Sequence, residues 1–120
     1  MMSLSLLLLV MAASPAAAEA DPMAAFYGNR LVIQAGPYWS AERRYAPDHT
    51  YRDQVVDDGY DRDVSGTWTL EDGKVCITQV KPEPDRRYCN LGPGHKLGDA
   101  WTDRDPYTGN EVRFRLEPQE

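Results

Sequence analysis

Apolar and polar residues alternate in short runs along most of this chain, and turn-forming residues separate the runs. Val112, Phe114 and Leu116, for example, alternate with Arg113 and Arg115. This period of two is typical of a β-strand with one buried face and one solvated face. The strands that the pattern predicts are Arg30–Ala35, Tyr38–Tyr45, Thr50–Val56, Val64–Leu70, Lys74–Val80, Arg87–Leu91, Asp99–Thr102 and Glu111–Leu116.

The clearest local element is a hairpin centred on Asp72-Gly73, because Asp-Gly between two alternating runs is the strongest short-range hairpin signal. A two-residue type I′ turn places Trp68 opposite Ile77 and gathers the large apolar residues of both strands on one face. A type I turn with a bulge at Gly73 would instead shift the register and put Trp68 beside Cys76. We favour the two-residue turn, because it separates apolar from polar side chains without exception.

Strands with one buried and one solvated face, joined in sequence order by short turns, form an antiparallel meander. About seven or eight of them in a chain of this size would curl into a small barrel or a strongly curved sheet, which hides the sheet edges. The one helical turn predicted is Asp21–Tyr27, with Asp21 as its N-cap and Pro22 at the first helical position. The fold-class prediction is therefore a single all-β domain over residues 21–120.

Residues 1–20 have the layout of a secretory signal peptide. Leu4–Met11 is an uncharged apolar run, small residues follow it, and Ala18-Glu19-Ala20 fits an A-x-A cleavage site. The run is too short to span a bilayer, which needs about 20 apolar residues. We therefore expect cleavage after Ala20, with Ala18 as the rival site. The remaining domain is expected to be periplasmic or secreted, without stable membrane insertion.

Cys76 and Cys89 are the only two cysteines in the chain. In an exported protein, two cysteines most simply form one disulfide. A bridge that closes so short a loop stabilises the fold by about 3 kcal/mol. A redox pair usually has the spacing C-x-x-C, and a metal site needs about four clustered ligands. The sequence therefore predicts a structural disulfide that ties the central hairpin to the strand Arg87–Leu91.

The net charge of the chain narrows the classes of partner that we expect. The chain has 19 acidic and 13 basic residues, a net charge of −6, and Glu19 is the only charged residue before residue 21. An acidic surface argues against binding to nucleic acid and to anionic membranes. The adjacent pairs Arg43-Arg44 and Arg86-Arg87 are interpreted as solvated or ion-paired side chains rather than as a phosphate site. The expected partner is a protein or a small molecule.

Residues that could carry chemistry are few. The acidic segment Asp57–Asp63 could offer oxygen ligands to Ca²⁺, but it does not fit an EF-hand loop, and we interpret it as a solvated hairpin loop. His49 and His95 each lie in a predicted turn without a neighbour at ligand spacing. Ser40 and Ser65 are the only serines after residue 20, and no nucleophile or nucleotide-binding motif surrounds them. We therefore predict no catalytic residue, no cofactor and no metal, and a protein that is not an enzyme.

Aromatic residues are the remaining candidates for a binding surface. The chain has 3 Trp and 7 Tyr, many of them in predicted strands. Aromatic side chains suit strands and cross-strand pairs on packing grounds alone. They also supply large contact areas with a polar tip at binding faces. The residues predicted to form a ligand or partner surface are Trp39, Tyr45, Tyr51 and Trp101.

Several of these motifs together resemble a class of small exported bacterial proteins, of alphaproteobacterial type and unknown function. The resemblance rests on Gly66-Thr67-Trp68-Thr69-Leu70, on the strand that follows Asp72-Gly73 with Cys76, and on Tyr88-Cys89, with Tyr51 in the Tyr-rich strand. It covers Asn29–Asn90. A more distant similarity is to lipocalin-like and avidin-like barrels, which also use a Gly-x-Trp strand, although in lipocalins this motif is on the first strand.

The leading functional hypothesis is a non-enzymatic exported β-domain that binds a partner or ligand. A second hypothesis is an inhibitor of a secreted or periplasmic hydrolase, with Pro82–Arg87 or Gly92–Gly98 as the inserting loop. A third is a small hydrolase that uses carboxylates, and a fourth is a carrier of a small lipophilic ligand, which needs an open apolar cup. A filled or a hollow interior would discriminate among them.

Overall fold

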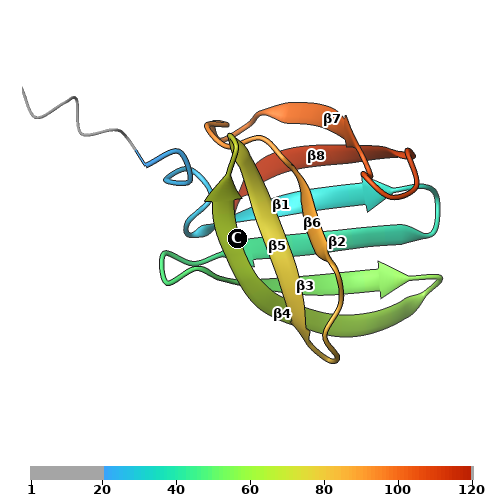
Figure 1. Ribbon diagram of the computed structural model, residues 1–120. Helices are drawn as coiled ribbons and strands as arrows, with labels where there is room; N and C mark the ends of the chain where they lie inside the picture. The colour runs from blue at the N-terminus through green and yellow to red at the C-terminus, as the bar shows by residue number, and fades with distance from the viewer. Residues whose placement is uncertain (1–20, 120) are drawn as a thin grey trace, which may run out of the picture.

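The computed structural model describes residues 21–119, so the predicted signal peptide lies outside the described residues. These residues form one antiparallel sheet of eight strands, which confirms the predicted all-β meander (Figure 1). Among the described residues, no helix is long and apolar enough to cross a membrane. The strands are β1 Asn29–Ala35, β2 Trp39–Tyr45, β3 Thr50–Asp57, β4 Tyr60–Glu71, β5 Lys74–Lys81, β6 Arg87–Leu91, β7 Ala100–Arg104 and β8 Glu111–Pro118.

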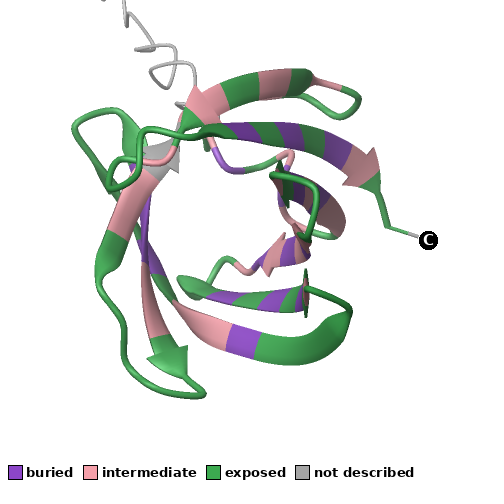
Figure 2. Cartoon of the chain, turned by 90° about the vertical axis from the view of Figure 1, so that its right-hand side faces the viewer, coloured by how far each residue is buried: buried purple, intermediate pink, exposed green. Residues whose placement is uncertain are grey.

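The sheet curls into a half-barrel in the order β6-β5-β4-β3-β2-β1-β8-β7. The last strand, β8, pairs with β1, whereas β6 and β7 follow each other in sequence but are the two ends of the sheet. Seen from the end of the sheet, the strands surround a common interior with the buried residues in stripes (Figure 2). Side chains bridge the seam between β6 and the turn after β7: the Tyr107 hydroxyl donates to the Arg87 carbonyl, and the Tyr107 ring contacts Tyr88 edge-to-face at 5.0 Å.

The predicted register of the central hairpin is confirmed, because Trp68 pairs with Ile77 across β4 and β5. Asp72 and Gly73 both have positive φ, at 50° and 73°, as a type I′ turn requires. The prediction of a loop over Asp57–Asp63 is wrong. Asp58-Gly59 forms a second turn with positive φ at both residues, and β4 therefore begins at Tyr60.

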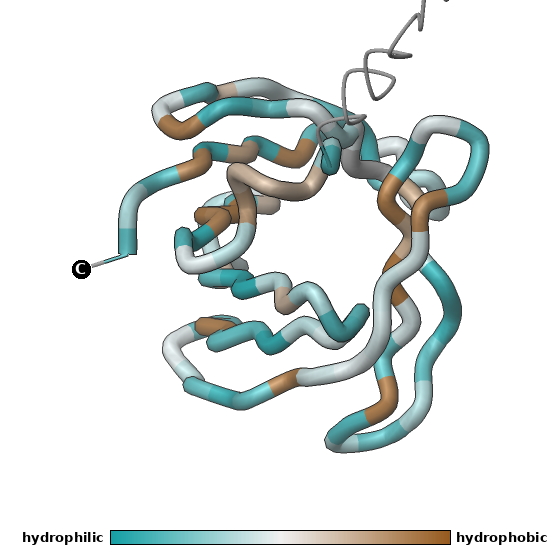
Figure 3. The backbone as a smooth tube through the Cα atoms, turned by 90° about the vertical axis from the view of Figure 1, so that its left-hand side faces the viewer, coloured by the Kyte–Doolittle hydropathy of each residue, from teal (hydrophilic) through white to brown (hydrophobic). Residues whose placement is uncertain are grey.

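Alternating residues of the strands face the interior and form the core, and apolar and polar positions alternate along the chain (Figure 3). Each fully buried large side chain contributes about 1.5–3 kcal/mol. The segment before β1 packs into one end of the half-barrel with Met23 and Phe26, which are 0% and 1% exposed. This segment is a series of turns rather than a helix. Its predicted N-cap is nevertheless present, because Asp21 Oδ1 accepts a hydrogen bond from the Met23 backbone N–H at 2.9 Å.

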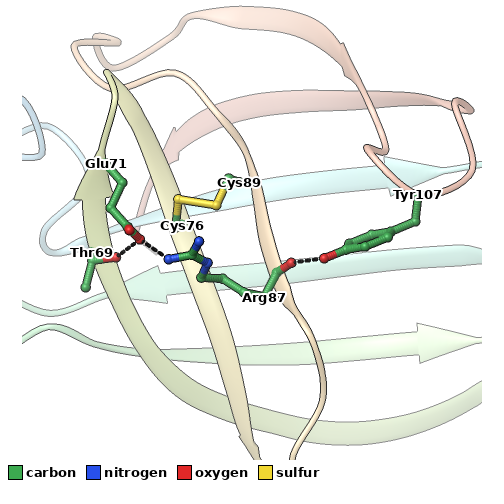
Figure 4. Close-up of a disulfide and its surroundings, with 6 residues drawn as sticks. All are labelled: Thr69, Glu71, Cys76, Arg87, Cys89 and Tyr107. Carbon is green, nitrogen blue, oxygen red and sulfur yellow. Dashed lines mark hydrogen bonds and ion pairs between the residues drawn. A yellow bond between two sulfur atoms is a disulfide. The ribbon is translucent and has the colours of Figure 1, made fainter.

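The predicted disulfide is confirmed between Cys76 on β5 and Cys89 on β6 (Figure 4). It closes a sequence separation of 13 residues, for which chain entropy gives about 3 kcal/mol. On the same side, Arg87 forms an ion pair with Glu71, and Glu71 also accepts a hydrogen bond from Thr69. The bridge and the ion pair therefore fasten β6 to the central hairpin. In the described part of the chain, β6 has no strand neighbour on its other edge.

The sheet leaves no space for a side chain at Gly66. A β-bulge between Ser65 and Gly66 shifts the pairing of β4 with β5. A Cβ atom at Gly66 would lie 2.0 Å from the Thr78 carbonyl oxygen and 2.9 Å from Cε1 of Tyr51. The Thr78 carbonyl belongs to a paired strand and cannot move without distorting the sheet, and the Tyr51 ring is fully buried.

We predict that Gly66→Ala lowers the free energy of unfolding by about 3 kcal/mol, because the added methyl group overpacks a backbone contact. Gly92→Ala is the matched control, since the nearest atom to its Cβ is His95 Nε2 at 3.7 Å and its φ is not positive. Urea unfolding of the two variants measures the difference. Equal midpoints for the two would contradict the assigned contact.

Candidate functional site: an interior cavity above a buried ion pair

The interior of the half-barrel contains a cavity of about 320 Å³. This volume is at the lower end of the range that holds small organic ligands. Apolar side chains from six strands make up most of the wall, and polar side chains lie at two levels within it. The lining residues are Ile33, Ala35, Trp39, Arg43, Tyr51, Asp53, Val55, Arg62, Val64, Ile77, Gln79, Asp85, Tyr88, Asp105, Val112 and Phe114.

The inner polar level is an ion pair between Arg43 on β2 and Asp53 on β3, which are direct cross-strand partners. Arg43 Nε donates to Asp53 Oδ1 at 2.7 Å, and Arg43 Nη2 donates to Asp53 Oδ2 at 2.8 Å. Arg43 Nη1 donates to the Tyr45 hydroxyl at 3.2 Å, and the guanidinium carbon is 5.0 Å from the centre of the Tyr51 ring. Arg43 is 7% exposed and Asp53 is 4% exposed, so both charges are buried.

The pair is held together by its mutual attraction. Burial disfavours the charge on Arg43, but the Asp53 carboxylate and the Tyr45 hydroxyl outweigh burial and hold the pKa of the guanidinium above its ordinary value. A guanidinium has five N–H donors, and the bonds to Asp53 and Tyr45 use three of them. Arg43 and Asp53 both line the cavity, so the pair forms its polar base.

The outer polar level is the mouth, where the exposed lining residues are charged. Arg62 is paired with Asp57 at 3.4 Å, and Asp85 and Asp105 come from the loops that flank the seam between β6 and β7. Gln79 donates to the backbone carbonyl of Glu83 at 2.9 Å and so holds the loop after β5 at this rim. The cavity therefore has an apolar wall between a charged rim and a polar base.

The four aromatic residues predicted as a binding surface do not share one face. Trp39 and Tyr51 both line the cavity, and Tyr51 is only 1% exposed. Tyr45 is 4% exposed and packs against Phe26 and Trp68 at the filled end, so it belongs to the core. Trp101 stacks between His95 and Phe114, with ring centres 3.4 Å and 5.5 Å away. That any of them binds a ligand stays a prediction.

Side chains that could ligate a metal converge at the disulfide. Among residues 21–119, one group of three potential ligands lies together, Glu71 with Cys76 and Cys89, and both sulfur atoms are joined in the bridge. His49 stacks on Trp68 at 4.0 Å, with Nδ1 3.1 Å from the Trp68 carbonyl oxygen. His95 stacks on Trp101 in the same way. The histidines thus pack on tryptophan rings.

Sequence reasoning missed Arg43 and Asp53 as site residues. Arg43 has the same strand parity as Ala41 and Tyr45, and Asp53 has the same parity as Tyr51 and Val55. A charged residue at an apolar position of each of two successive strands is the signal that could have revealed a buried pair.

No family model, no curated protein and no solved structure matches this chain. The chain is therefore classified by its fold alone. Residues 21–119 form a small all-β domain, a curled half-barrel of eight antiparallel strands with one disulfide.

We predict that Arg43→Met and Asp53→Leu each lower the free energy of unfolding by about 3–5 kcal/mol, because each leaves a buried charge unpaired. The double variant Arg43→Met/Asp53→Leu should recover most of that loss, since it removes both charges. Denaturant unfolding of the four proteins gives the coupling energy. Losses that simply add in the double variant would contradict a coupled buried pair.

We predict that stability falls at alkaline pH as buried tyrosines ionise. Burial raises the pKa of Tyr51 to about 12 and also raises that of Tyr45, whereas tyrosine in an unfolded chain titrates near pH 10. Their contribution is complete below about pH 10 and is lost as the pH rises toward about 12. Thermal unfolding across this window measures the slope. Tyr51→Phe should flatten it, and an unchanged slope in that variant would contradict the assignment.

Proposed function

We propose that this chain is an exported, non-enzymatic binding domain that holds a small, largely apolar molecule in its interior cavity. The observation that carries the proposal is the combination of an apolar wall with a polar base, since ligand sites are mostly apolar with a few placed polar groups. Export is supported by the signal-peptide pattern in residues 1–20 and by the disulfide, which persists in oxidising compartments.

Binding is favoured over catalysis by the state of the polar groups in the cavity. Asp53 receives two hydrogen bonds from Arg43, and Arg43 is held in its charged form by Asp53. Neither group is therefore well placed to exchange a proton with a substrate. The Arg43 guanidinium at the polar base suits a ligand that carries a neutral acceptor, such as a carbonyl or hydroxyl oxygen.

The sequence resemblances fit this proposal. The chain resembles small exported bacterial β-domains in its Gly66-Thr67-Trp68 strand and its two cysteines, and lipocalin-like barrels use a hollow interior for lipophilic ligands. In this chain the Gly-x-Trp strand is β4, in the middle of the sequence, and Trp68 packs with Tyr45 at the filled end. We propose that Trp68 and its neighbours close one end of the cup, while the residues around Trp39 receive the ligand.

The test is binding of a neutral apolar dye, N-phenyl-1-naphthylamine, followed by dye fluorescence. The unmodified domain should bind the dye and enhance its emission. Val55→Phe puts a ring into the cavity and should weaken binding about tenfold, because the ligand would lose about 1–3 kcal/mol of contact.

Val56→Phe is the matched control, because Val56 is the next residue on the same strand and is 42% exposed on the outer face. It should leave dye binding unchanged. Absence of dye binding by the unmodified domain, or equal effects of the two variants, would contradict the proposal.

A further inference from the structure

A row of basic residues crosses the outer face of the sheet. Arg44 on β2 is the direct cross-strand partner of Arg52 on β3, Arg52 is the partner of Ser65 on β4, and Ser65 is the partner of Lys81 on β5. We call these three basic residues, together with Ser65 between them, the basic row. All four line one groove on the outside of the sheet.

The β-bulge at Ser65 and Gly66 is what brings Lys81 into this row. Gly66 pairs with Gln79 and Ser65 pairs with Lys81, so Val80 is an additional residue in β5. A bulge of this kind re-aims the side chains that follow it. Gln79 lines the interior cavity, whereas Lys81, two residues later, lines the outer groove.

Two members of the basic row, Arg52 and Lys81, lack the carboxylate partners that two exposed arginines of the same face have. On the same outer face, Arg113 pairs with Glu111, and Arg115 pairs with Glu117. Within residues 21–119, neither Arg52 nor Lys81 has a carboxylate within ion-pair distance. The chain has more acidic than basic residues, so a shortage of carboxylates does not explain this.

The charges within the row are also poorly compensated. Arg44 is 3.9 Å from Glu42, but Glu42 makes its closer ion pair with Arg30, at 2.9 Å. Arg44 and Arg52 are like charges directly opposite each other, an arrangement that destabilises a sheet. Among the described residues that line the groove, Asp63 is the one carboxylate besides the buried Asp53, which is paired with Arg43. The groove therefore has an excess of positive charge without an internal partner.

We propose that the basic row binds a ligand with two or more phosphate or sulfate groups in series. The planar guanidinium groups of Arg44 and Arg52 match the oxygen pairs of such groups, and the Ser65 hydroxyl can donate beside them. Adjacent strands are about 4.8 Å apart, so Lys81 lies about 10 Å from Arg52 along the row. This is the backbone separation, and a ligand with two oxyanions in series spans it with one group at Arg44 and Arg52 and the other at Lys81.

The experiment is titration of the domain with inorganic tripolyphosphate by calorimetry at low ionic strength. The unmodified domain should bind it, and Arg44→Gln/Arg52→Gln should weaken binding about tenfold or more. Lys81→Gln should weaken tripolyphosphate binding but leave binding of inorganic phosphate unchanged. The matched control is Arg113→Gln/Arg115→Gln, which removes two exposed arginines of the same face that have carboxylate partners.

Two results would overturn the proposal: no binding of tripolyphosphate by the unmodified domain, or an equal loss in the control variant. Thermal unfolding supplies a second readout. Without ligand, Arg52→Gln should raise the melting temperature, because it removes the repulsion from Arg44. With tripolyphosphate, the unmodified domain should gain stability and Arg44→Gln/Arg52→Gln should not.

Vesicles identify the source of the oxyanions. Binding to vesicles of phosphatidylglycerol and phosphatidylcholine that Arg44→Gln/Arg52→Gln abolishes would support lipid headgroups as the ligand. Tripolyphosphate binding without vesicle binding would support a soluble one, and vesicle binding that is insensitive to the variants would count against the site. Val55→Phe should leave the binding of tripolyphosphate and of vesicles unchanged, so this proposal and that for the interior cavity fail separately.

Discussion

The interior of this half-barrel is organised by two opposite charges that must stay together. Arg43 and Asp53 face each other across β2 and β3 and are both buried. Removing a charge from water is expensive unless a partner is held in good geometry, and here two parallel hydrogen bonds supply it. The Tyr45 hydroxyl and the Tyr51 ring complete the surroundings of the guanidinium. Arg43 and Asp53 line the cavity, while Tyr45, which accepts a hydrogen bond from Arg43, packs with Phe26 and Trp68 in the aromatic core.

The two ends of the curled sheet differ because different segments cover them. At the filled end, the turns before β1 insert Met23 and Phe26, and the Pro22 carbonyl accepts a hydrogen bond from the Gly94 backbone N–H at 2.8 Å. That bond ties the first segment to the connection between β6 and β7. Side chains and loops, rather than a strand ladder, therefore complete the barrel at its seam, and Asp85 and Asp105 beside the seam reach the mouth of the cavity.

The fold was largely predictable because its signals are local, whereas the site depends on contacts between strands. Asp72-Gly73 predicted both a turn and a register, since positive φ at two residues leaves few possible turn types. Asp58-Gly59 carries the same signal, but its acidic neighbours suggested a loop. The cavity could not be predicted, because its volume depends on how far the sheet curls. The ion pair could not be predicted from the sequence, because charged residues in an alternating strand are normally assigned to the solvated face. Asp53 is identified as the partner of Arg43 only once the register of β2 and β3 is known.

The adjacent residues Arg43 and Arg44 belong to two different candidate sites, although they lie on the same strand. Successive side chains of a strand point to opposite faces, so Arg43 enters the interior while Arg44 joins the basic row outside. A slip of one residue between β2 and β3 would bring Arg44 against Asp53 and so would keep an ion pair. It would also turn Glu42 inward and expose Tyr45. The ion pair alone therefore does not select the register. The apolar residues of β2 select it, and the ion pair then determines what the interior is able to hold.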